Sequence, residues 1–590
     1  MEITRIFDLL DQYRELYPGK KDALVHKAYG QWTPVSSDEY IHTSGRVSAA
    51  LLALGIRKGD KVATILNNSP YWNFLDMGLL QIGAVQVPIY PTISEENFRH
   101  IFCEAEVRLI FISNLEIYEK IKGAVKDLPA LQGIYSIEKI NGLGDWDDFL
   151  SHGSPDDHNR LEQVKREIKP SDVATIIYTS GTTGKPKGVM LSHHNFISNF
   201  LAVSEIIRDN MVDTALSFLP LCHVYERMLN YMYQNVGISV IYAENIDKVG
   251  DNMREVHPEL FCAVPRVIEK SFNRIMAKGR ELKGIKRMLF FWAVALGNRY
   301  ELNHANGRWY HFKLRIADKL VFKKWREALG GKLDIIVSGG ATLQQRLARI
   351  FWACGIRIME GYGLTETSPV IAVSNFKPGG VRFGTVGHVL PGVEVKIAPD
   401  GEILCRGPNV MMGYFKHPEL TAEVIDSEGW FHTGDIGTLL DGKYLKITDR
   451  KKEMFKTSGG KYIAPQILEN RFKESPFVEN IMVIGEHRHF TSALIIPNFD
   501  HLRSWCRVKE LPYTTDSDAI ANERIVARIR RAVDEINAGL DKIEQIKKFE
   551  LLDKPWTVEE GDLSPTLKLR RSVLEDKYKD IIEKIYACGD

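Results

Sequence analysis

The sequence lacks the features that would place it in several specialised classes. Its seven cysteines are spread over 590 residues, and none of them forms a C-x-x-C pair. That pattern argues against a zinc ribbon and a disulfide framework, and it predicts reduced thiols in a cytoplasmic protein. The 77 basic and 76 acidic residues leave a formal net charge of +1, which argues against a generally basic nucleic-acid-binding protein.

Long hydrophobic runs are also missing. The most apolar stretch, Met288–Gly297, is far shorter than the roughly 18 residues that a membrane-spanning helix needs. At the start of the chain, acids interrupt the apolar residues, which predicts an amphipathic first helix and not a signal peptide. The expected apolar face of this helix consists of Ile3, Ile6, Phe7, Leu10 and Tyr13.

From about residue 60 the chain alternates between strand-like and helix-like segments. Residues 61–66, 85–90 and 109–113 are apolar runs of strand length, and residues 71–82 and 94–106 have helical spacing. Such alternation predicts a mostly parallel sheet that is covered by helices. With 590 residues, the chain is also too long for a single hydrophobic core.

Two changes in composition predict the domain organisation. After about Gly384, short strands are separated by Gly, Pro and Asp turns, which is typical of an antiparallel meander or a small β-barrel. After Arg450, helices and strands mix as in a separate α+β domain. We therefore expect a large N-terminal α/β domain over residues 1–450, with a β-rich part over about 384–450, and a smaller C-terminal α+β lid domain over residues 451–590.

The segment Tyr178–Gly188, YTSGTTGKPKG, carries the strongest chemical signal. It follows a buried strand-like run and precedes a helix-like stretch. Its glycines let the backbone approach a ligand closely, and its hydroxyl and lysine side chains can bind phosphate oxygens. Pro186 stands where a P-loop NTPase has the Ser or Thr that binds magnesium, so this is not that loop. A solvated glycine-rich turn is the alternative interpretation.

This segment resembles the phosphate-binding loop of the AMP-forming acyl-CoA synthetases, and further motifs of that family follow in the family's order. Gly361–Pro369 (GYGLTETSP) resembles the adenine and magnesium segment, and Thr433–Asp435 with Asp449–Arg450 resembles the ribose-binding pair. Leu563–Arg570 (LSPTLKLR) resembles the motif of the catalytic lysine. The matches run from about residue 60 to 571, nearly the whole chain.

The resemblance implies sites for ATP, Mg²⁺ and coenzyme A. Lys568, Glu366 and Thr365 would be catalytic, and Glu366 would bind Mg²⁺ together with Thr179. The implied nucleotide and coenzyme A contacts are Thr179, Ser180, Gly181, Thr182, Thr183, Gly184, Lys185, Lys187, Gly340, Ala341, Gly361, Tyr362, Gly363, Asp435, Arg450, Lys452, Gly459 and Gly460. Gly340 and Ala341 belong to SGGAT at residues 338–342, for which an ordinary β–α turn is the alternative.

The implied nucleotide roles suit the chemistry of the side chains. Tyr362 offers a flat face on which adenine can stack. Asp435 is an acceptor for both hydroxyls of a ribose, and Arg450 presents a planar set of donors to ribose and phosphate oxygens. TGD or DR alone would be an ordinary turn, so these assignments depend on the order of the motifs.

Two positions depart from the commonest family pattern. Leu567 precedes Lys568 where a glycine is usual, and this variant resembles the long-chain fatty acyl branch. Lys452 stands at the hinge, where many members have an acidic residue. Because Arg570 and Arg571 are close by, a solvated basic turn is the alternative interpretation of the Lys568 segment.

The motif LPLCHVYER at Leu219–Arg227 resembles the family segment that lines the acyl pocket. His223 and Tyr225 would then lie at the pocket entrance, and core packing is the alternative. Cys222 and His223 have no second ligand pair at zinc spacing, so a metal site is not expected.

Residues 271–332 combine positive charge with aromatic side chains. They contain 15 Lys or Arg and 4 Asp or Glu, a difference of 15 − 4 = +11, together with ten aromatic residues. Such a segment suits the surface of an anionic membrane. Alternatively, it is a helical insertion that packs its aromatics on the body of the protein and leaves its lysines in water. RNA binding would use the same basic surface but has no support from the other motifs.

The resemblance therefore implies an ATP-dependent long-chain fatty acid–CoA ligase. The fatty carboxylate would attack the α-phosphorus of ATP and release pyrophosphate, and the thiol of coenzyme A would then attack the acyl-adenylate and release AMP. One alternative is an adenylation unit that loads a carrier protein, against which the lack of a carrier domain argues. Another is a nucleotide-binding sensor without catalysis, against which Glu366, Asp435, Arg450 and Lys568 argue. Acyl chain length and oligomeric state stay open.

Overall fold

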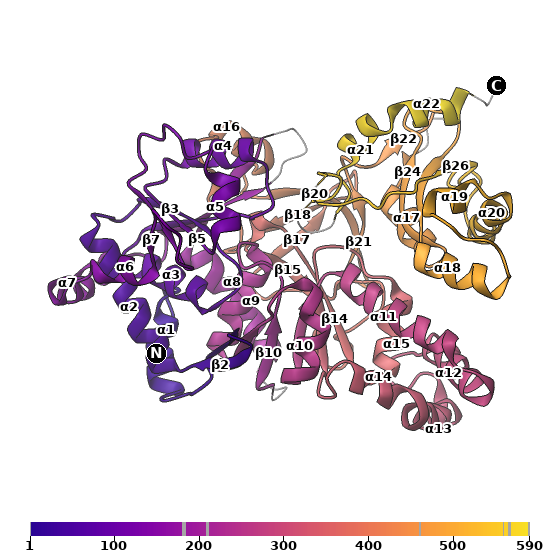
Figure 1. The fold of residues 1–590 in the computed structure, drawn as a ribbon, viewed down its shortest axis with the longest axis horizontal. Coiled ribbons are helices and arrows are strands. Elements are labelled where there is room, and N and C mark those ends of the chain that lie inside the picture. Colours follow the sequence, from indigo (N-terminus) through magenta and orange to yellow (C-terminus); the bar gives the residue numbers. More distant parts are fainter. Residues whose placement is uncertain are drawn as a thin grey trace.

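The protein is described by a computed structural model that covers residues 2–179, 185–207, 212–458, 462–558, 560–564 and 568–587. Two large β-sheets lie in the N-terminal part of the chain, and a smaller sheet lies in the C-terminal part (Figure 1). The fold is therefore a large α/β N-terminal domain with a small C-terminal α+β domain, as the alternation of segments predicts. Among the described residues, no helix is long and apolar enough to cross a bilayer.

The eight-stranded sheet is built largely from the first part of the chain. Its order is β19 (Gly413–Tyr414), β9 (Lys187–Ser192), β8 (Val173–Thr179), β4 (Val85–Pro88), β3 (Lys61–Ile65), β5 (Leu109–Ile112), β6 (Gly133–Ser136) and β7 (Gly144–Asp145). From β8 to β7 all neighbouring strands are parallel, whereas β9 and β19 pair antiparallel. The predicted strands at residues 61–66, 85–90 and 109–113 are confirmed, as are the helices between them, α3 (Pro70–Gln81) and α4 (Glu95–Ala105).

The thirteen-stranded sheet has a parallel part and an antiparallel part. The parallel strands are β1 (Leu24–Ala28), β11 (Ser239–Tyr242), β10 (Thr214–Ser217), β12 (Leu260–Ala263), β13 (Ile335–Ser338) and β14 (Arg357–Gly363), and β2 (Gln31–Val35) pairs antiparallel at the edge. The antiparallel strands are β15 (Val370–Val373), β16 (His388–Val389), β21 (Tyr444–Arg450), β20 (Phe431–Leu440), β18 (Glu402–Arg406) and β17 (Glu394–Ile397). The antiparallel pairing predicted after Gly384 is thus present. These strands extend the large sheet, and β17 is its edge strand.

Helices α8 (His193–Ile207) and α9 (Val224–Asn235) contribute to the main hydrophobic core together with both sheets. The first helix is present as α1 (Asp8–Leu16). All five residues of its predicted apolar face are buried, but Ile3, Ile6 and Phe7 precede the helix. Arg227 on α9 is fully buried against Asp76 of α3, and its Nη1 donates to Thr175 Oγ1 of β8 at 2.7 Å. This ion pair ties the helix that carries the LPLCHVYER motif to the eight-stranded sheet.

The basic and aromatic segment forms the helices of an insertion. These are α11 (Pro265–Glu281), α12 (Gly284–Gly297), α13 (Gly307–Ala317), a π-helical turn (Asp318–Phe322) and α14 (Lys323–Ala328). Five of its aromatic side chains are buried in a second core, namely Phe272, Phe290, Tyr310, Phe322 and Trp325. The packing interpretation is correct for these five residues.

The C-terminal domain surrounds a three-stranded sheet of β24 (Val478–Ile484), β25 (Ser492–Pro497) and β26 (Lys548–Leu551). One face packs on α17 (Pro465–Phe472), α18 (Phe499–Val508) and α20 (Glu523–Asn537), and the other on α21 (Arg571–Lys577) and α22 (Lys579–Ala587). Both cores contain only residues from Phe455 onward, and we keep residue 450/451 as the proposed domain boundary.

Candidate active site

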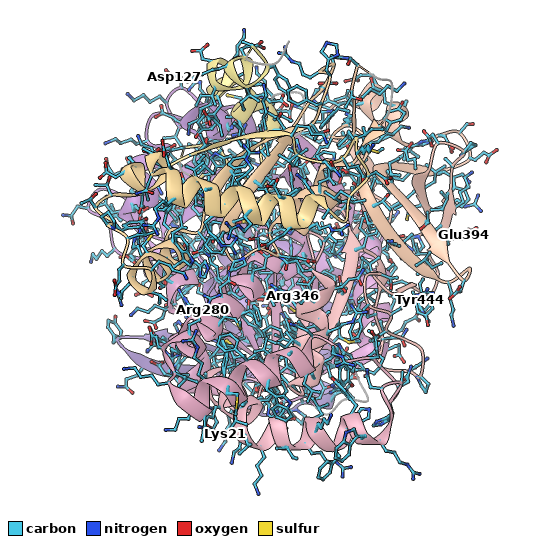
Figure 2. All side chains as sticks on the ribbon, turned by 90° about the vertical axis from the view of Figure 1, so that its right-hand side faces the viewer. Lys21, Asp127, Arg280, Arg346, Glu394 and Tyr444 are labelled. Carbon is cyan, nitrogen blue, oxygen red and sulfur yellow. The ribbon has the colours of Figure 1, made fainter. Side chains whose placement is uncertain are left out.

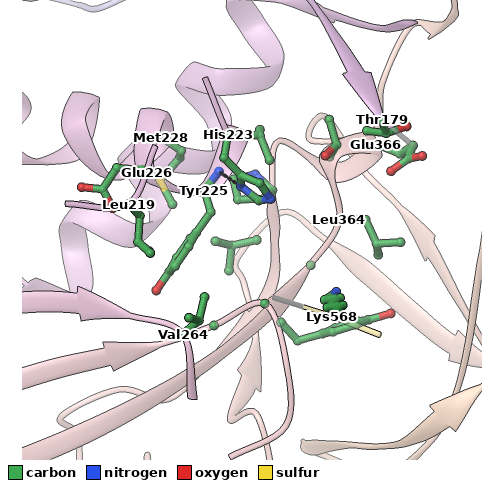
Figure 3. Close-up of a pocket in the computed structure, with 18 of the residues that line it drawn as sticks. Thr179, Leu219, His223, Tyr225, Glu226, Met228, Val264, Leu364, Glu366 and Lys568 are labelled. Carbon is green, nitrogen blue, oxygen red and sulfur yellow. Dashed lines mark hydrogen bonds between the residues drawn. The ribbon is translucent and has the colours of Figure 1, made fainter. Parts of the chain in front are cut away.

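A cavity of about 1000 Å³ opens between the N-terminal domain and the C-terminal domain. Its walls come from the ends of β8, β13 and β14, from the start of α9, and from residues 450–453 and Lys568. Figure 3 shows Thr179 and Glu366 close together in one part of the cavity and Leu219, Tyr225 and Met228 in another, with His223 between them. The cavity thus brings residues from most of the sequence motifs to one place.

The phosphate-binding segment differs from the predicted strand–loop–helix element. Thr179 ends β8 and faces Lys187, the first residue of β9, so β8 is followed in the chain by an antiparallel strand. Helix α8 begins only at His193, at the far end of β9. Val189 and Leu191 of β9 lie in the core, and Met190 between them pairs with Ile176 of β8.

The residues of this segment fall into three groups. Thr179 and Lys187 line the cavity. Lys185 is exposed and is not one of the residues of the described chain that line it. Ser180, Gly181, Thr182, Thr183 and Gly184 lie outside the described residues.

Glu366 is held at the cavity by a contact that the motifs did not predict. It lies in a short 3-10 turn (Thr365–Thr367) between β14 and β15, and its carbonyl accepts from Met411 N–H at 2.8 Å. Tyr414 O–H donates to Glu366 Oε1 at 3.0 Å. Because β19 pairs with β9, Tyr414 also lies beside Lys187, whose Nζ is 5.5 Å from the centre of its ring.

The chemistry of Glu366 suits a single magnesium ligand. Burial raises the pKa of Glu366, and the hydrogen bond from Tyr414 opposes that rise. In the described part of the chain, no group of three or more His, Cys, Asp or Glu could hold a metal ion by itself. Mg²⁺ at nucleotide sites is commonly held by one or two carboxylates plus phosphate oxygens and water. The single carboxylate of Glu366, on the same cavity as Thr179 and Lys187, fits this pattern.

The adenine segment lines the cavity from Gly361 to Glu366. The hairpin of β14 and β15 has an irregular register at Tyr362 and Gly363. A Cβ on Gly363 would lie 1.7 Å from the carbonyl oxygen of Pro369, so no other residue fits there without a backbone shift. The glycine is therefore required by the hairpin itself as well as by access to the cavity.

The TGD and DR motifs meet as neighbours on β20 and β21, where Asp435 pairs directly with Arg450. Arg450 Nε lies 3.3 Å from Asp435 Oδ1, and Tyr362 O–H donates to Asp435 Oδ2 at 2.8 Å. Arg450 lines the cavity, whereas Asp435 is only 5% exposed and lies behind Tyr362 and Arg450. Burial raises the pKa of Asp435, and the positive charge of Arg450 opposes that rise.

Lys568 lies on the cavity wall and not in a solvated basic turn. Burial lowers the pKa of Lys568 to about 8, and the positive charge of Arg450 lowers it further. Nearby Arg571, whose side chain is 13% exposed, pairs with Glu469 at 2.7 Å and with Glu453 at 3.2 Å. These ion pairs fix the segment that carries Lys568, and Leu567 lies outside the described residues.

His223 and Tyr225 both line the cavity. His223 caps α9 by accepting the Tyr225 N–H on Nδ1 at 3.1 Å, and Tyr225 O–H donates to the Val337 carbonyl at 3.3 Å. Burial, with a smaller effect of the charge on Lys568, lowers the pKa of His223 to about 4, so the ring is neutral at pH 7. The adjacent apolar wall consists of Val203, Leu219, Val224, Met228, Leu229, Val264, Val267 and Val337.

Glu226 is a cavity residue that the sequence did not single out. It is fully buried, and burial raises the pKa of Glu226 to about 8. It follows the predicted pair His223 and Tyr225, but nothing in its spacing distinguishes it from a surface glutamate on α9.

The remaining predicted residues are two on the cavity wall, one on the protein surface and two outside the described residues. Gly340 and Lys452 line the cavity. Ala341 is exposed and is not among the described residues of the wall. Gly459 and Gly460 lie outside the described residues, so the predicted coenzyme A contacts there stay predictions.

Comparison with known protein families finds the AMP-binding enzymes over residues 11–415 and the C-terminal domain of AMP-binding enzymes over residues 453–590. The long-chain-fatty-acid–CoA ligase FadD15 of Mycobacterium bovis is 33% identical over 570 residues, which cover 94% of this chain and 93% of the relative. The ligase ACSBG2 of Xenopus laevis is 32% identical over 96% of this chain and 81% of its own length. The peroxisomal long chain acyl-CoA synthetase 7 of Arabidopsis thaliana is 32% identical over 95% of this chain and 82% of its own length.

Solved structures of similar fold include adenylation enzymes. The adenylation domain of a carboxylate reductase from Mycobacterium chelonae superposes with a TM-score of 0.75 at 22% identity, over 99% of this chain and 91% of that chain. ATP-bound MatB from Rhodopseudomonas palustris superposes with a TM-score of 0.72 at 22% identity, over 98% of this chain and 100% of that chain. At this identity the likeness concerns the fold.

Proposed function

The chain belongs to the AMP-binding, adenylate-forming enzymes, and on that premise we propose that it is an ATP-dependent long-chain fatty acid–CoA ligase. The observation that carries the proposal is one cavity that joins a polar nucleotide end to an apolar acyl end. Thr179, Glu366, Arg450 and Lys568 line the first, and the apolar wall around Met228 lines the second.

In the first half-reaction, the fatty carboxylate attacks the α-phosphorus of ATP and pyrophosphate leaves. Negative charge develops on the phosphate oxygens, and Lys568 is the cavity lysine that we assign to balance it at the α-phosphate. Arg450 and Lys187 add positive charge to the same part of the cavity. Mg²⁺, when bound at Glu366, supplies charge neutralisation for the phosphates. Thr179 and Thr365 contribute hydroxyl groups to this end.

In the second half-reaction, the thiol of coenzyme A attacks the acyl-adenylate carbonyl and AMP leaves. In the structure, Lys568 lines the cavity, where the negative charge of Asp435 favours its protonated form. We propose that the C-terminal domain rotates between the two steps about Lys452, which withdraws Lys568 and admits the thiol.

The long-chain assignment has two supports. The acyl end of the cavity is apolar over a wall that extends from Val203 to Val337, as a hydrocarbon chain requires. In addition, similar proteins include ligases named for long-chain fatty acids, at 33% and 32% identity over 94% and 96% of this chain.

A panel of carboxylic acids tests this proposal. Acids from acetate to a C20 fatty acid, plus aryl acids, are assayed for AMP release with ATP, Mg²⁺ and coenzyme A. We expect the highest kcat/KM with long-chain acids, and Glu366→Gln should lose activity with all of them. A peak at acetate or at an aryl acid contradicts the long-chain assignment. Pyrophosphate exchange without any transfer to free coenzyme A would indicate a carrier-loading enzyme instead.

A further inference from the structure

The insertion presents a cluster of exposed apolar side chains. Of the fourteen large hydrophobic side chains that are exposed on the described chain, six lie between residues 285 and 320. They are Ile285, Met288, Trp309, Phe312, Ile316 and Leu320, each between 39% and 71% exposed. Exposed apolar side chains that gather on one part of a surface mark interaction sites more often than scattered ones do.

Four of these side chains form a stripe on one face. Trp309, Phe312, Ile316 and Leu320 are spaced by three or four residues, which places them on the same side of a helix. The rings of Trp309 and Phe312 stack with centroids 5.4 Å apart. The opposite side already packs on the core through Tyr310, Ala317, Val321 and Phe322. The stripe is therefore additional to the face that holds the insertion in place.

Basic side chains flank the stripe. Residues 307–324 contain six Lys or Arg and one acid, Asp318. Arg308, Arg315, Lys319 and Lys323 are exposed at positions that alternate with the apolar residues, and Lys313 Nζ lies 5.2 Å from the centre of the Trp309 ring. Asp318 is paired with Arg326, whose Nη1 also donates to the Cys354 carbonyl, so Arg326 holds the insertion to the body and is not part of the exposed surface.

We propose that this face, the α12–α13 surface (residues 285–288 and 308–324), docks on an anionic lipid bilayer. Tryptophan and long basic side chains are suited to the boundary between headgroups and acyl chains, and a row of lysines and arginines is attracted to anionic headgroups. Figure 2 shows the insertion helices at the lower edge of the molecule, with side chains that extend away from the body. A nucleic acid would use the basic residues but would gain little from Ile316 and Leu320.

The docked surface is connected to the cavity by a single helix. Val264 and Val267 line the cavity at the start of α11, which continues for 17 residues to the turn before α12. At about 1.5 Å per residue, this helix spans roughly 25 Å. Binding of the α12–α13 surface to lipid does not depend on which acid the enzyme activates.

The test measures co-sedimentation of the full chain with phosphatidylcholine vesicles that contain or lack phosphatidylglycerol. We expect binding only to the anionic vesicles, and the binding should weaken steeply with salt because the Debye length falls from about 10 Å at 0.1 M to about 3 Å at 1 M. Brominated lipids should quench the tryptophan fluorescence of the wild-type protein more than that of the Trp309→Phe variant. Absence of binding to anionic vesicles at low salt would overturn the proposal.

Three variants separate the contributions of the basic and the aromatic side chains to vesicle binding. Arg315→Gln/Lys319→Gln/Lys323→Gln should reduce the partition coefficient by about a hundredfold, since each basic residue near an anionic surface contributes about fivefold. Trp309→Ser/Phe312→Ser should reduce it by at least tenfold. The matched control is Arg507→Gln/Val508→Ala/Lys509→Gln, which removes an exposed apolar residue and two exposed basic residues from the C-terminal domain and should bind as wild type.

Circular dichroism and activity on a soluble medium-chain acid should be the same in all four proteins, which makes loss of folding visible. If the Trp309→Ser/Phe312→Ser variant keeps full affinity for anionic vesicles, or if the control loses as much affinity as the charge variant, the proposal is wrong. A dimer in sedimentation velocity that dissociates in the same variant would assign the stripe to a second copy of the chain and would also overturn it.

Discussion

The phenol of Tyr414 donates a 3.0 Å hydrogen bond to the carboxylate of Glu366, 48 residues earlier in the chain. This bond holds the predicted magnesium ligand in one orientation beside Thr179. We expect Tyr414→Phe to raise the Mg²⁺ concentration for half-maximal ATP–pyrophosphate exchange and to lower the rate by about tenfold, since a hydrogen bond to a charged group contributes about 1.5–3 kcal/mol. Tyr29→Phe, at a fully exposed tyrosine, serves as the control. An unchanged Mg²⁺ dependence would contradict the role of Tyr414.

The pKa of Lys568 predicts an alkaline limit for adenylation. Burial and the charge on Arg450 lower this pKa to about 8. Only the protonated amine carries charge, so kcat/KM for adenylation should be highest below pH 8 and should fall as the pH rises through that value. Bound ATP favours the protonated amine of Lys568. The pH at which kcat begins to fall should therefore be higher than the pH at which kcat/KM falls.

The pH profiles of ATP–pyrophosphate exchange in wild type and Lys568→Arg check this. The guanidinium of Lys568→Arg stays charged, so its profile should lack the alkaline limit even if its rate is lower. If the rates of both proteins fall at the same alkaline pH, the fall belongs to a group other than Lys568.

One contact between the domains predicts a selective effect on the first half-reaction. Arg266 Nη1 donates to the Glu479 carbonyl at 3.1 Å, and Nη2 pairs with the Glu479 carboxylate. Because this contact stabilises the arrangement in which Lys568 lies in the cavity, Arg266→Ala should slow adenylation by about tenfold and leave thioester formation from supplied acyl-adenylate nearly unchanged. Arg503→Ala, which breaks a 3.0 Å pair with Asp516 inside the C-terminal domain, is the matched control. Equal slowing of both steps would rule out this explanation.

The buried pair of Arg227 and Asp76 predicts a large effect on stability. Both side chains are fully buried, and Tyr231 O–H also donates to Asp76 Oδ2 at 2.6 Å. Removal of one partner leaves an uncompensated buried charge, so Arg227→Ala should lower the free energy of unfolding by about 3–5 kcal/mol. Arg254→Ala, at an exposed pair with Asp251, should change it by less than about 1 kcal/mol. Similar melting temperatures for the two variants would contradict the anchoring role of Arg227.

Much of the fold follows from local patterns. Apolar runs of strand length at residues 61–66 and 109–113 are continuous because parallel strands are buried on both faces. The strand β9 was missed because Lys187–Ser192 is short, begins with the lysine and glycine of the loop motif, and leads directly into α8. Its strand character comes from pairing with β8 and β19, which a local pattern does not contain.

The site was predictable where a motif fixes the chemistry of one residue. Glu366, Arg450 and Lys568 were named from motif order, and all three line one cavity. Tyr414 and Glu226 were missed because their roles depend on long-range pairing and on burial, and neither leaves a signal in the spacing of residues. Arg326 is one of the 15 basic residues of the 271–332 segment, but its hydrogen bond to the distant Cys354 carbonyl cannot be read from local sequence.

In the mechanism that we propose, Lys568 acts in adenylation alone and rotation about Lys452 permits the second step. The most direct measurement assays the two half-reactions separately, as acid-dependent ATP–pyrophosphate exchange and as thioester formation from supplied acyl-adenylate and coenzyme A. Lys568→Ala should lose adenylation by about 10²-fold or more and keep thioester formation. Lys452→Pro should do the opposite, because proline fixes φ near −65° at the hinge, while Lys452→Ala should keep both steps. If Lys568→Ala and Lys452→Pro slow the two half-reactions equally, the rotating-domain account and both residue assignments are contradicted.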